Sequence, residues 1–205
     1  MARLRVAVLI SGRGSNLQAL IDAAADPAYP AEIVLVLSNA PAAAGLQRAA
    51  EAGIATAIVD HRGHATRHDF EAALNQVLDA HRVGLVCLAG FMRLLTARFS
   101  AHRQDRLINI HPSLLPQFKG LDTHARVLAA GDAKTGCTIH FVRPDMDSGP
   151  IIAQAEVEVR ADDTEDSLAA RVLAAEHGLY PRVLRALAEH RVHIDGDRVT
   201  VDGVI

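Results

Sequence analysis

Short, nearly continuous apolar runs alternate with longer amphipathic stretches through the first half of the chain. The apolar runs, which we predict to be strands, are 5–10, 32–38, 55–59 and 84–90. The amphipathic stretches between them, which we predict to be helices, are 17–25, 43–52 and 68–81. Strands that are apolar along their whole length are typical of a parallel sheet covered on both faces. The alternation therefore predicts an α/β fold, a mostly parallel twisted sheet with right-handed crossovers and helices on both faces.

The second half of the chain has a different pattern. Residues 136–142 and 150–159 are apolar runs joined by a turn, and we expect them to form an antiparallel, hairpin-like addition to the sheet. Residues 162–190 form a long amphipathic stretch that opens with acidic residues, which suit the positive end of a helix dipole. Pro181 lies inside this stretch and is expected to break or kink the helix. Alternating residues on either side of 195–196 predict a short C-terminal hairpin.

Length and composition favour one soluble domain with an aliphatic core. The chain has 205 residues, of which 50% are hydrophobic and 3% are aromatic. A net charge of −3 argues against a protein that binds nucleic acid nonspecifically. No apolar run approaches the roughly 20 residues that span a bilayer, and the N-terminal run has no signal-peptide cleavage site. We therefore predict a cytoplasmic protein with no membrane or nucleic-acid partner.

A glycine-containing loop, SGRGSN at 11–16, follows the first predicted strand and opens the first predicted helix. Glycines in such a turn let the backbone approach a ligand, and the amides at a helix N-terminus attract anions. The spacing matches neither a dinucleotide-binding fingerprint nor a Walker A loop. The loop alone is therefore compatible with phosphate binding, which its position favours, and with an ordinary strand-to-helix turn.

Asn109 and His111 stand two residues apart in the stretch LINIHPSLLPQFKG at 107–120. On an extended strand that spacing places both side chains on one face, opposite Ile108 and Ile110. The carboxyl ends of strands in an α/β sheet are where such folds bind ligands, which makes this pair a candidate site. The alternative is a pair of polar side chains satisfied by backbone groups at the end of a strand.

Two further features concern charge and metal chemistry. Asp145 and Asp147 lie in a turn at 143–149, where one carboxylate either fills an ordinary turn position or folds back to pair with His111. A carboxylate beside an imidazole raises the imidazole pKa and orients the ring. Arg93 stands among apolar residues and is expected to meet an anionic or carbonyl partner. No histidine pair has metal-ligand spacing with a carboxylate nearby, so we predict no metal.

An ordered set of motifs over nearly the whole chain resembles the folate-dependent phosphoribosylglycinamide formyltransferases. The motifs are, in chain order, SGRGSNLQAL, LSNAPAAAGLQRAAEAGIAT, LAGFMRLLT, INIHPSLLPQFKGLDTH, GCTIHFV, MDSGPIIAQAEVEV and AAEHGLYPRVL. The resemblance implies one formyltransferase-type, Rossmann-like domain over 1–205, with a phosphate- and ribonucleotide-binding half at 1–100 and a folate and catalytic half at 101–205. It implies transfer of the formyl group of 10-formyltetrahydrofolate to the amino group of glycinamide ribonucleotide, giving formylglycinamide ribonucleotide and tetrahydrofolate in de novo purine biosynthesis.

The same resemblance implies a catalytic triplet of Asn109, His111 and Asp147. The amine would attack the formyl carbon directly, and Asn109 and a protonated His111 would stabilise the oxyanion of the tetrahedral intermediate. Asp147 would hold His111 in its charged form and help to move protons from the amine to the leaving folate nitrogen. The formyl folate would then be a co-substrate, and no metal is expected.

The resemblance also implies contacts for both substrates. The ribonucleotide phosphate would bind at Gly14, Ser15 and Asn16, and the ribose would contact Glu176. The folate would lie against a largely apolar set of residues: Phe91, Met92, Arg93, Leu94, Leu95 and Val142. Arg67 is expected to meet the glutamate end of the folate. Both partners are then small molecules, and a homodimer is one assembly that we consider.

Three other functions would each require different sequence features. A 10-formyltetrahydrofolate hydrolase, or another formyl-folate enzyme, shares the Asn-x-His and Asp constellation but usually carries an extra N-terminal regulatory domain, whereas this chain begins directly at its first predicted strand. A methionyl-tRNA formyltransferase would carry a sizeable C-terminal RNA-binding domain. A non-catalytic nucleotide-binding module that used only 11–16 gives no reason for Asn109, His111 and Asp147 to occur together.

Overall fold

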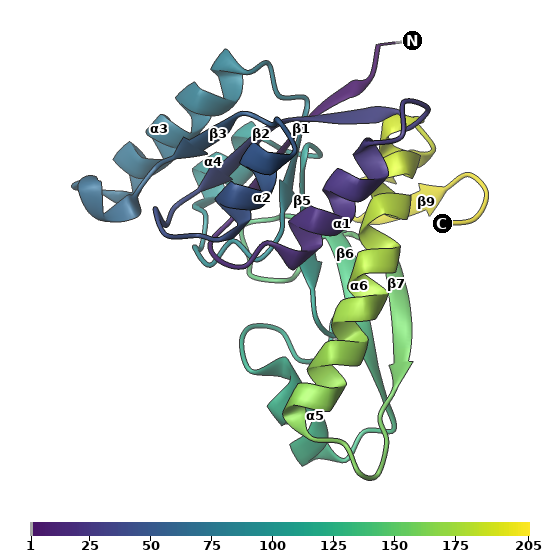
Figure 1. The fold of residues 1–205 in the computed structure, drawn as a ribbon. Helices are drawn as coiled ribbons and strands as arrows, with labels where there is room; N and C mark the ends of the chain where they lie inside the picture. The colour runs from purple at the N-terminus through teal and green to yellow at the C-terminus, as the bar shows by residue number, and fades with distance from the viewer. Residues whose placement is uncertain (1) are drawn as a thin grey trace.

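The apolar runs of the sequence become neighbouring strands of one seven-stranded sheet in the computed structural model, which describes residues 2–205 (Figure 1). The strand order across the sheet is β3-β2-β1-β4-β5-β6-β7. In chain order the strands are β1 (Leu4–Ile10), β2 (Ala31–Ser38), β3 (Thr56–Ile58), β4 (Leu85–Leu88), β5 (Leu107–His111), β6 (Lys134–Phe141) and β7 (Ile151–Glu158). Strands β1 to β5 pair in parallel, and β6 and β7 add to the sheet in antiparallel pairings. The predicted α/β sheet with an antiparallel addition is confirmed.

Helices cover both faces of this sheet, as its apolar strands require. They are α1 (Ser15–Ala24), α2 (Gly45–Glu51), α3 (Arg67–Ala80), α4 (Ala97–His102), α5 (Thr123–Ala130) and α6 (Glu165–Ala188), with a short 3-10 helix, η1, at His61–Gly63. Leucine side chains of α1 and α6 pack in one core cluster with Val8 and Cys87, whereas those of α3 pack in a second cluster with Leu9 and Val86. No helix within residues 2–205 is long and apolar enough to cross a bilayer.

Helix α6 continues through Pro181 to Ala188, so the predicted break at this proline does not occur. Proline lacks an N–H, which removes the helical hydrogen bond to the carbonyl of His177 one turn earlier. The Pro181 carbonyl nevertheless accepts a hydrogen bond from the hydroxyl of Tyr29 at 2.6 Å. Leu179 and Leu184 on either side of the proline are buried in the core. Burial of this helix face therefore outweighs the loss of one backbone bond.

Glycines with a positive φ determine how two of the strands end. The strand predicted at 84–90 stops at Leu88, because the chain turns at Gly90, which has a φ of 74°. The predicted C-terminal hairpin is confirmed as β8 (Val192–Asp195) paired with β9 (Arg198–Val201). Gly196 lies in the turn between them and has a φ of 60°.

The connections of the sheet create a crevice between β1 and β4. After β1 the chain passes to β2 and β3 on one side, and it then returns to β4 on the other side of β1. The helices that follow β1 and β4 pack on opposite faces of the sheet, so the two loops diverge. In open α/β sheets such a switch point, at the carboxyl ends of the strands, is where ligands bind. The loop at 11–16 follows β1 directly and therefore lies at this point.

Candidate active site

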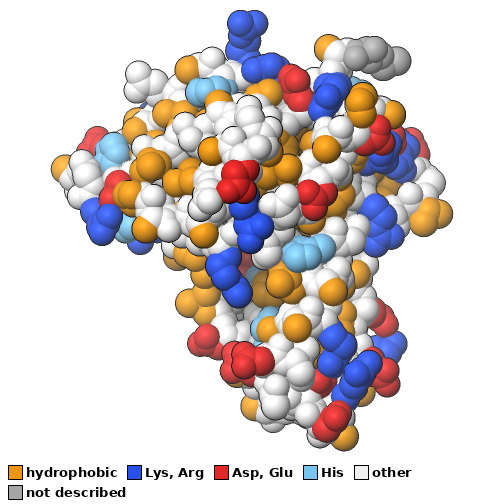
Figure 2. All heavy atoms as spheres, viewed as in Figure 1, with side chains coloured by type: hydrophobic (Ala, Val, Ile, Leu, Met, Phe, Trp, Pro, Cys, Tyr) orange, Lys and Arg blue, Asp and Glu red, His pale blue; other side chains and the backbone are white. Residues whose placement is uncertain are grey.

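A cavity of about 340 Å³ opens between the loops that follow β1 and β4. Its lining consists of Ser11, Gly12, Arg13, Gly14, Ser15, Asn16, Ala89, Gly90 and Met92. Figure 2 shows a hollow in the face that carries α1, α2 and α6, with Lys or Arg and His side chains around it. The three residues predicted to hold a phosphate therefore all belong to a cavity wall.

Close glycine contacts shape the loop of this cavity. Gly14 precedes α1 with a φ of 70°, a left-handed conformation that glycine adopts without strain. A Cβ on Gly14 would lie 2.8 Å from Cα of Gly45, at the start of α2. The Gly45 amide donates to the Gly12 carbonyl at 3.0 Å, and Nε of Arg48 donates to the Arg13 carbonyl at 3.0 Å. Helix α2 thus holds the loop carbonyls, and Ser15 and Asn16 at the start of α1, where backbone amides favour an anion, line the cavity.

Asn16 and Glu176, predicted to contact the phosphate and the ribose, are hydrogen-bonded to each other. Nδ2 of Asn16 donates to Oε2 of Glu176 at 2.7 Å. Burial raises the pKa of the Glu176 carboxyl, and the hydrogen bond from Asn16 opposes this effect only in part. Oδ1 of Asn16 is buried and has no hydrogen-bond partner within residues 2–205. This orphaned acceptor suits a hydroxyl or other donor group of a ligand in the cavity.

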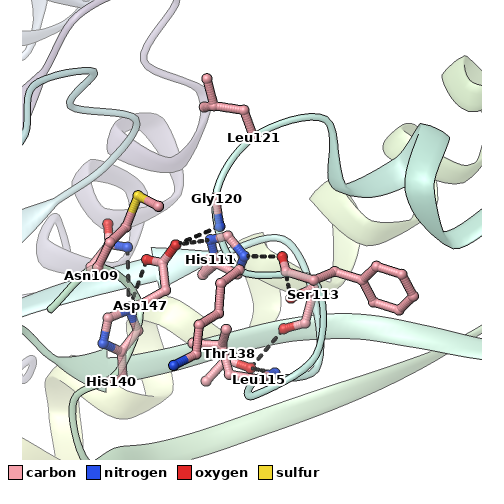
Figure 3. A network of polar contacts seen from close by, with 12 residues as sticks. Asn109, His111, Ser113, Leu115, Gly120, Leu121, Thr138, His140 and Asp147 are labelled. Carbon is pink, nitrogen blue, oxygen red and sulfur yellow. Dashed lines mark hydrogen bonds and ion pairs between the residues drawn. The ribbon is translucent and has the colours of Figure 1, made fainter.

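The triplet predicted from the sequence comes together in three dimensions (Figure 3). Asn109 and His111 project from β5, and Asp147 reaches them from the loop between β6 and β7. Oδ2 of Asp147 lies 3.4 Å from Nδ1 of His111 and accepts a hydrogen bond from the Gly120 amide at 2.9 Å. Asp147 has a φ of 49°, a left-handed conformation that aspartate tolerates better than most residues. Of the two roles left open for this carboxylate, the structure shows the one that pairs with His111.

The hydrogen bonds of His111 determine which of its ring nitrogens exchanges a proton. Nε2 lies 2.9 Å from the carbonyl oxygen of Phe118, which can only accept, so Nε2 carries a hydrogen. Nδ1, which faces Asp147, is therefore the nitrogen that gains or loses a proton. Phe118 has a φ of 52°, an uncommon conformation for an aromatic residue. Backbone strain is thus located at the residue that orients the imidazole.

His140 joins this cluster, although no sequence pattern indicates a role for it. It is the cross-strand partner of Asn109 in the β5–β6 pairing, and Nδ2 of Asn109 lies 3.3 Å from Nε2 of His140. Nδ1 of His140 lies 3.0 Å from the Phe141 carbonyl, to which it can only donate, so Nε2 is the ring nitrogen that faces the Asn109 amide. Nε2 also lies 3.7 Å from Oδ1 of Asp147. A histidine in the predicted strand 136–142 was visible in the sequence, but only the strand register identifies its partner.

Burial and polar contacts oppose each other in setting the pKa values of His111 and Asp147. It lowers the pKa of His111, and the contacts with the Phe118 carbonyl and Asp147 oppose this effect without reversing it. Burial also acts to raise the pKa of Asp147, but contacts with His140 and the Gly120 amide outweigh it, so that pKa is lowered. Asp147 thus favours the charged form of His111, as expected, but the net pKa is nevertheless lowered. The penalty of burying an imidazolium exceeds the stabilisation that the carboxylate provides.

The apolar residues predicted to contact folate form a partly exposed surface that reaches the cavity. Met92 and Leu94 are 63% and 61% exposed, and Met92 also lines the cavity. Phe91 is buried, and Leu95 and Val142 pack against the same core cluster from partly buried positions. Large apolar side chains that stay exposed beside a cavity are typical of a binding surface.

The two arginines predicted near the folate, Arg67 and Arg93, are both exposed. Arg93 forms no side-chain hydrogen bond within residues 2–205, so this part of the chain does not supply its expected partner. Arg67 begins α3, one turn before Glu71, whose carboxylate accepts a hydrogen bond from the Thr96 amide at 2.6 Å. The start of α3 is thereby tied to the end of the segment that contains Arg93.

Comparisons with known proteins show which family the chain resembles. Residues 4–184 match the formyl transferase family. The phosphoribosylglycinamide formyltransferase of Escherichia coli (strain K12) is 42% identical over 200 residues, which are 98% of this chain and 94% of that protein. The trifunctional purine biosynthetic protein adenosine-3 of Drosophila melanogaster is 52% identical over 187 residues, which are 90% of this chain and only 14% of that longer protein. The solved phosphoribosylglycinamide formyltransferase of Coxiella burnetii, in complex with CHES, superposes with a TM-score of 0.93 at 45% identity, covering 98% of this chain and 94% of that one.

Proposed function

The chain belongs to the formyl transferase family, and from that premise we propose that it transfers the formyl group of 10-formyltetrahydrofolate to the amino group of glycinamide ribonucleotide. The products are formylglycinamide ribonucleotide and tetrahydrofolate, in de novo purine biosynthesis. The observation that carries the proposal is the convergence of Asn109, His111 and Asp147 next to a cavity suited to a phosphate. Both partners are small molecules, and we place the reaction in the cytoplasm.

The cavity and the catalytic cluster lie on neighbouring strands. Asn109 is the cross-strand partner of Leu88 at the end of β4, and the next residue, Ala89, lines the cavity. A phosphate held at the start of α1 would leave the glycinamide end of the ribonucleotide to extend toward β5. Glu176, which accepts a hydrogen bond from Asn16 of the loop, would bind the ribose. Such alignment of two reactants is itself a large part of the rate enhancement.

The attack on the formyl carbon creates charge that Asn109 can stabilise. As the amine nitrogen bonds to the formyl carbon, the carbonyl oxygen becomes an oxyanion and the nitrogen becomes positively charged. One N–H of the Asn109 amide is held by His140 at 3.3 Å, which orients the amide and leaves its second N–H for the oxyanion. A donor oriented before the reaction needs no reorganisation when the charge appears.

His111 and Asp147 would move the proton between the two nitrogens. The lowered pKa of His111 makes its neutral, proton-accepting form the resting one. Nδ1 takes the proton that the attacking nitrogen loses, and Asp147 stabilises the resulting imidazolium. The bond from the formyl carbon to the folate nitrogen then breaks, and that nitrogen receives a proton from Nδ1, directly or through water. One proton leaves the amine and one reaches the folate, so the enzyme returns to its starting state.

We treat residues 1–205 as one domain for this reaction. The phosphate loop lies in 1–100 and the catalytic cluster lies in 101–205, but the folate surface at 91–95 and Glu176 do not follow that division. Asn109, His111, His140 and Asp147 all belong to one chain.

A spectrophotometric assay of 10-formyl folate, with and without glycinamide ribonucleotide, tests the proposal. Folate turnover that requires the ribonucleotide is the expected result. Turnover without the ribonucleotide would identify water as the acceptor and the chain as a 10-formyltetrahydrofolate hydrolase. An absence of turnover in both conditions would leave only a nucleotide-binding function.

A further inference from the structure

A chain of polar groups links the ends of four adjacent strands, which lie in the order β3-β2-β1-β4 across the sheet. The linked residues follow these strands in the same order, and they are His61, Asn39, Ser11 and Met92. Nδ2 of Asn39 lies 3.3 Å from Nδ1 of His61, and Oγ of Ser11 lies 2.5 Å from Oδ1 of Asn39. The amide of Met92 donates to Oγ of Ser11 at 2.8 Å. Each contact therefore spans one strand spacing at the carboxyl edge of the sheet.

The hydrogen-bond donors in this series of polar groups all point in one direction, from Met92 toward His61. The Met92 amide can only donate, so Oγ of Ser11 accepts from it, and the Ser11 hydroxyl in turn donates to Oδ1 of Asn39. The Asn39 amide group is then directed at Nδ1 of His61. Asn39 is only 5% exposed, and hydrogen bonds shielded from water are stronger and more directional than exposed ones. The backbone at Met92 is thereby tied to three other strand ends.

Ser11 is attached to the 90–92 segment at two points. Its amide donates to the Gly90 carbonyl at 3.1 Å, and its hydroxyl accepts from the Met92 amide at 2.8 Å. Ser11 is also directly followed by the loop 12–16, in which we propose that the phosphate binds. Ser11, Gly90 and Met92 all line the same cavity, and Met92 begins the exposed part of the folate surface. One serine therefore joins a wall of the ribonucleotide site to a wall of the folate site.

We propose that Ser11 is a positioning residue that holds the folate-binding segment against the phosphate loop, so that both substrates depend on its hydroxyl. The inference rests on the proposed function, because it concerns the sites of those two substrates. Ser11 acts through the Met92 backbone and does not touch the reacting atoms. Loss of its hydroxyl leaves the Met92 amide without this partner, while Asn109, His111 and Asp147 keep their own contacts.

The variant Ser11→Ala tests this inference. We expect the KM values for glycinamide ribonucleotide and for 10-formyl folate each to rise about five- to tenfold, the range for one lost hydrogen bond, with kcat within about threefold of the original. Amide hydrogen exchange at Met92 should become about tenfold faster. Ser11→Thr keeps the hydroxyl and should restore both KM values. Ser167→Ala is the matched control, because it removes a serine hydroxyl that donates to Asp163 near the start of α6.

Several outcomes would overturn the inference. Unchanged exchange at Met92 in Ser11→Ala would show that the hydroxyl does not hold the segment, and a rise in only one KM would show that the two sites are not joined. A Ser11→Thr enzyme as impaired as Ser11→Ala would assign the effect to packing. If the original enzyme transfers the formyl group and Ser11→Ala has unchanged KM values, the inference about Ser11 fails while the proposed function stands. A lack of ribonucleotide-dependent transfer by the original enzyme defeats the proposed function, and the inference with it.

Discussion

Oδ2 of Asp147 lies 3.4 Å from Nδ1 of His111, the ring nitrogen that is not bonded to the backbone. The opposite ring nitrogen is committed to the Phe118 carbonyl, so a proton can be exchanged only on the side that faces the carboxylate. Oδ1 of the same carboxylate lies 3.7 Å from Nε2 of His140. Asp147 thus contacts the imidazoles of both His111 and His140. The other ring nitrogen of each histidine is hydrogen-bonded to a main-chain carbonyl.

Removing either member of the Asp147–His111 pair should abolish most of the turnover. We expect His111→Ala and Asp147→Asn each to lower kcat by about 10²- to 10⁴-fold, the contribution of a positioned proton-transfer group. Both KM values should change less, because neither side chain lines the phosphate loop. His102 of α4 is exposed, and His102→Ala should keep the original kcat in the same assay. Near-normal kcat in both cluster variants would exclude the proposed roles.

The lowered pKa of His111 predicts how stability depends on pH. An unfolded histidine has a pKa of about 6.5, so on acidification the unfolded chain binds this proton before the folded chain does. The free energy of unfolding therefore falls as the pH drops through the window between the unfolded and the lower folded pKa. His111→Gln removes this titration and keeps an N–H for the Phe118 carbonyl. Its free energy of unfolding should fall less than that of the original chain between about pH 7.5 and about pH 5.

Urea unfolding at the two pH values measures this difference. The lowered pKa of Asp147 affects the free energy of unfolding only near and below the unfolded pKa of about 3.9, which lies outside the pH range of this comparison. His102→Ala lies outside the cluster and should show the same pH dependence as the original chain. An equal loss of stability in His111→Gln and in the original chain would contradict the prediction.

The contact between His140 and Asn109 predicts a graded loss of rate. Asn109→Ala should lower kcat by about 10²- to 10³-fold, the usual cost of one oxyanion donor. His140→Ala keeps the Asn109 amide but removes the contact that orients it. We therefore expect a smaller loss of kcat, about tenfold at saturating substrates. The matched control is Asn75→Ala, which removes an asparagine of α3 that accepts a hydrogen bond from Arg103 and should keep the original kcat. An unaltered kcat in His140→Ala would mean that His140 does not orient the Asn109 amide.

The packing of α2 on the phosphate loop predicts an effect specific to one substrate. A Cβ on Gly45 would lie 2.5 Å from Cδ1 of Ile10 and 3.2 Å from Cα of Gly14. Gly45→Ala should therefore displace the loop and raise KM for the ribonucleotide by about tenfold, with a smaller change in KM for the folate. Gly178→Ala is the control, because a Cβ there meets nothing within 4 Å and alanine favours the helix. Equal KM changes for both substrates would argue against a local displacement of the loop.

The elements of the fold and the candidate residues were predictable because they depend on local patterns. Apolar runs and amphipathic periods predicted β1 to β4 and the helices α1, α2 and α3 within a few residues of their ends, whereas the short helices α4 and α5 were not predicted. The spacing of Asn109 and His111 on one extended strand placed both side chains on one face, as the structure shows. Turn chemistry located the loop at 11–16 and the C-terminal hairpin. Each of these features involves residues that are close along the chain, so periodicity and turn preference suffice.

Only the tertiary structure decided which distant groups meet and how strongly they are buried. The choice of Asp147 as the partner of His111, the pairing of His140 with Asn109, and the bond from Asn16 to Glu176 across 160 residues all follow from how the strands and helices pack. The same holds for the direction of the His111 pKa, since burial, which no local pattern reveals, outweighs the neighbouring carboxylate. Local sequence specifies elements through periodicity, whereas contacts and desolvation arise only when those elements come together.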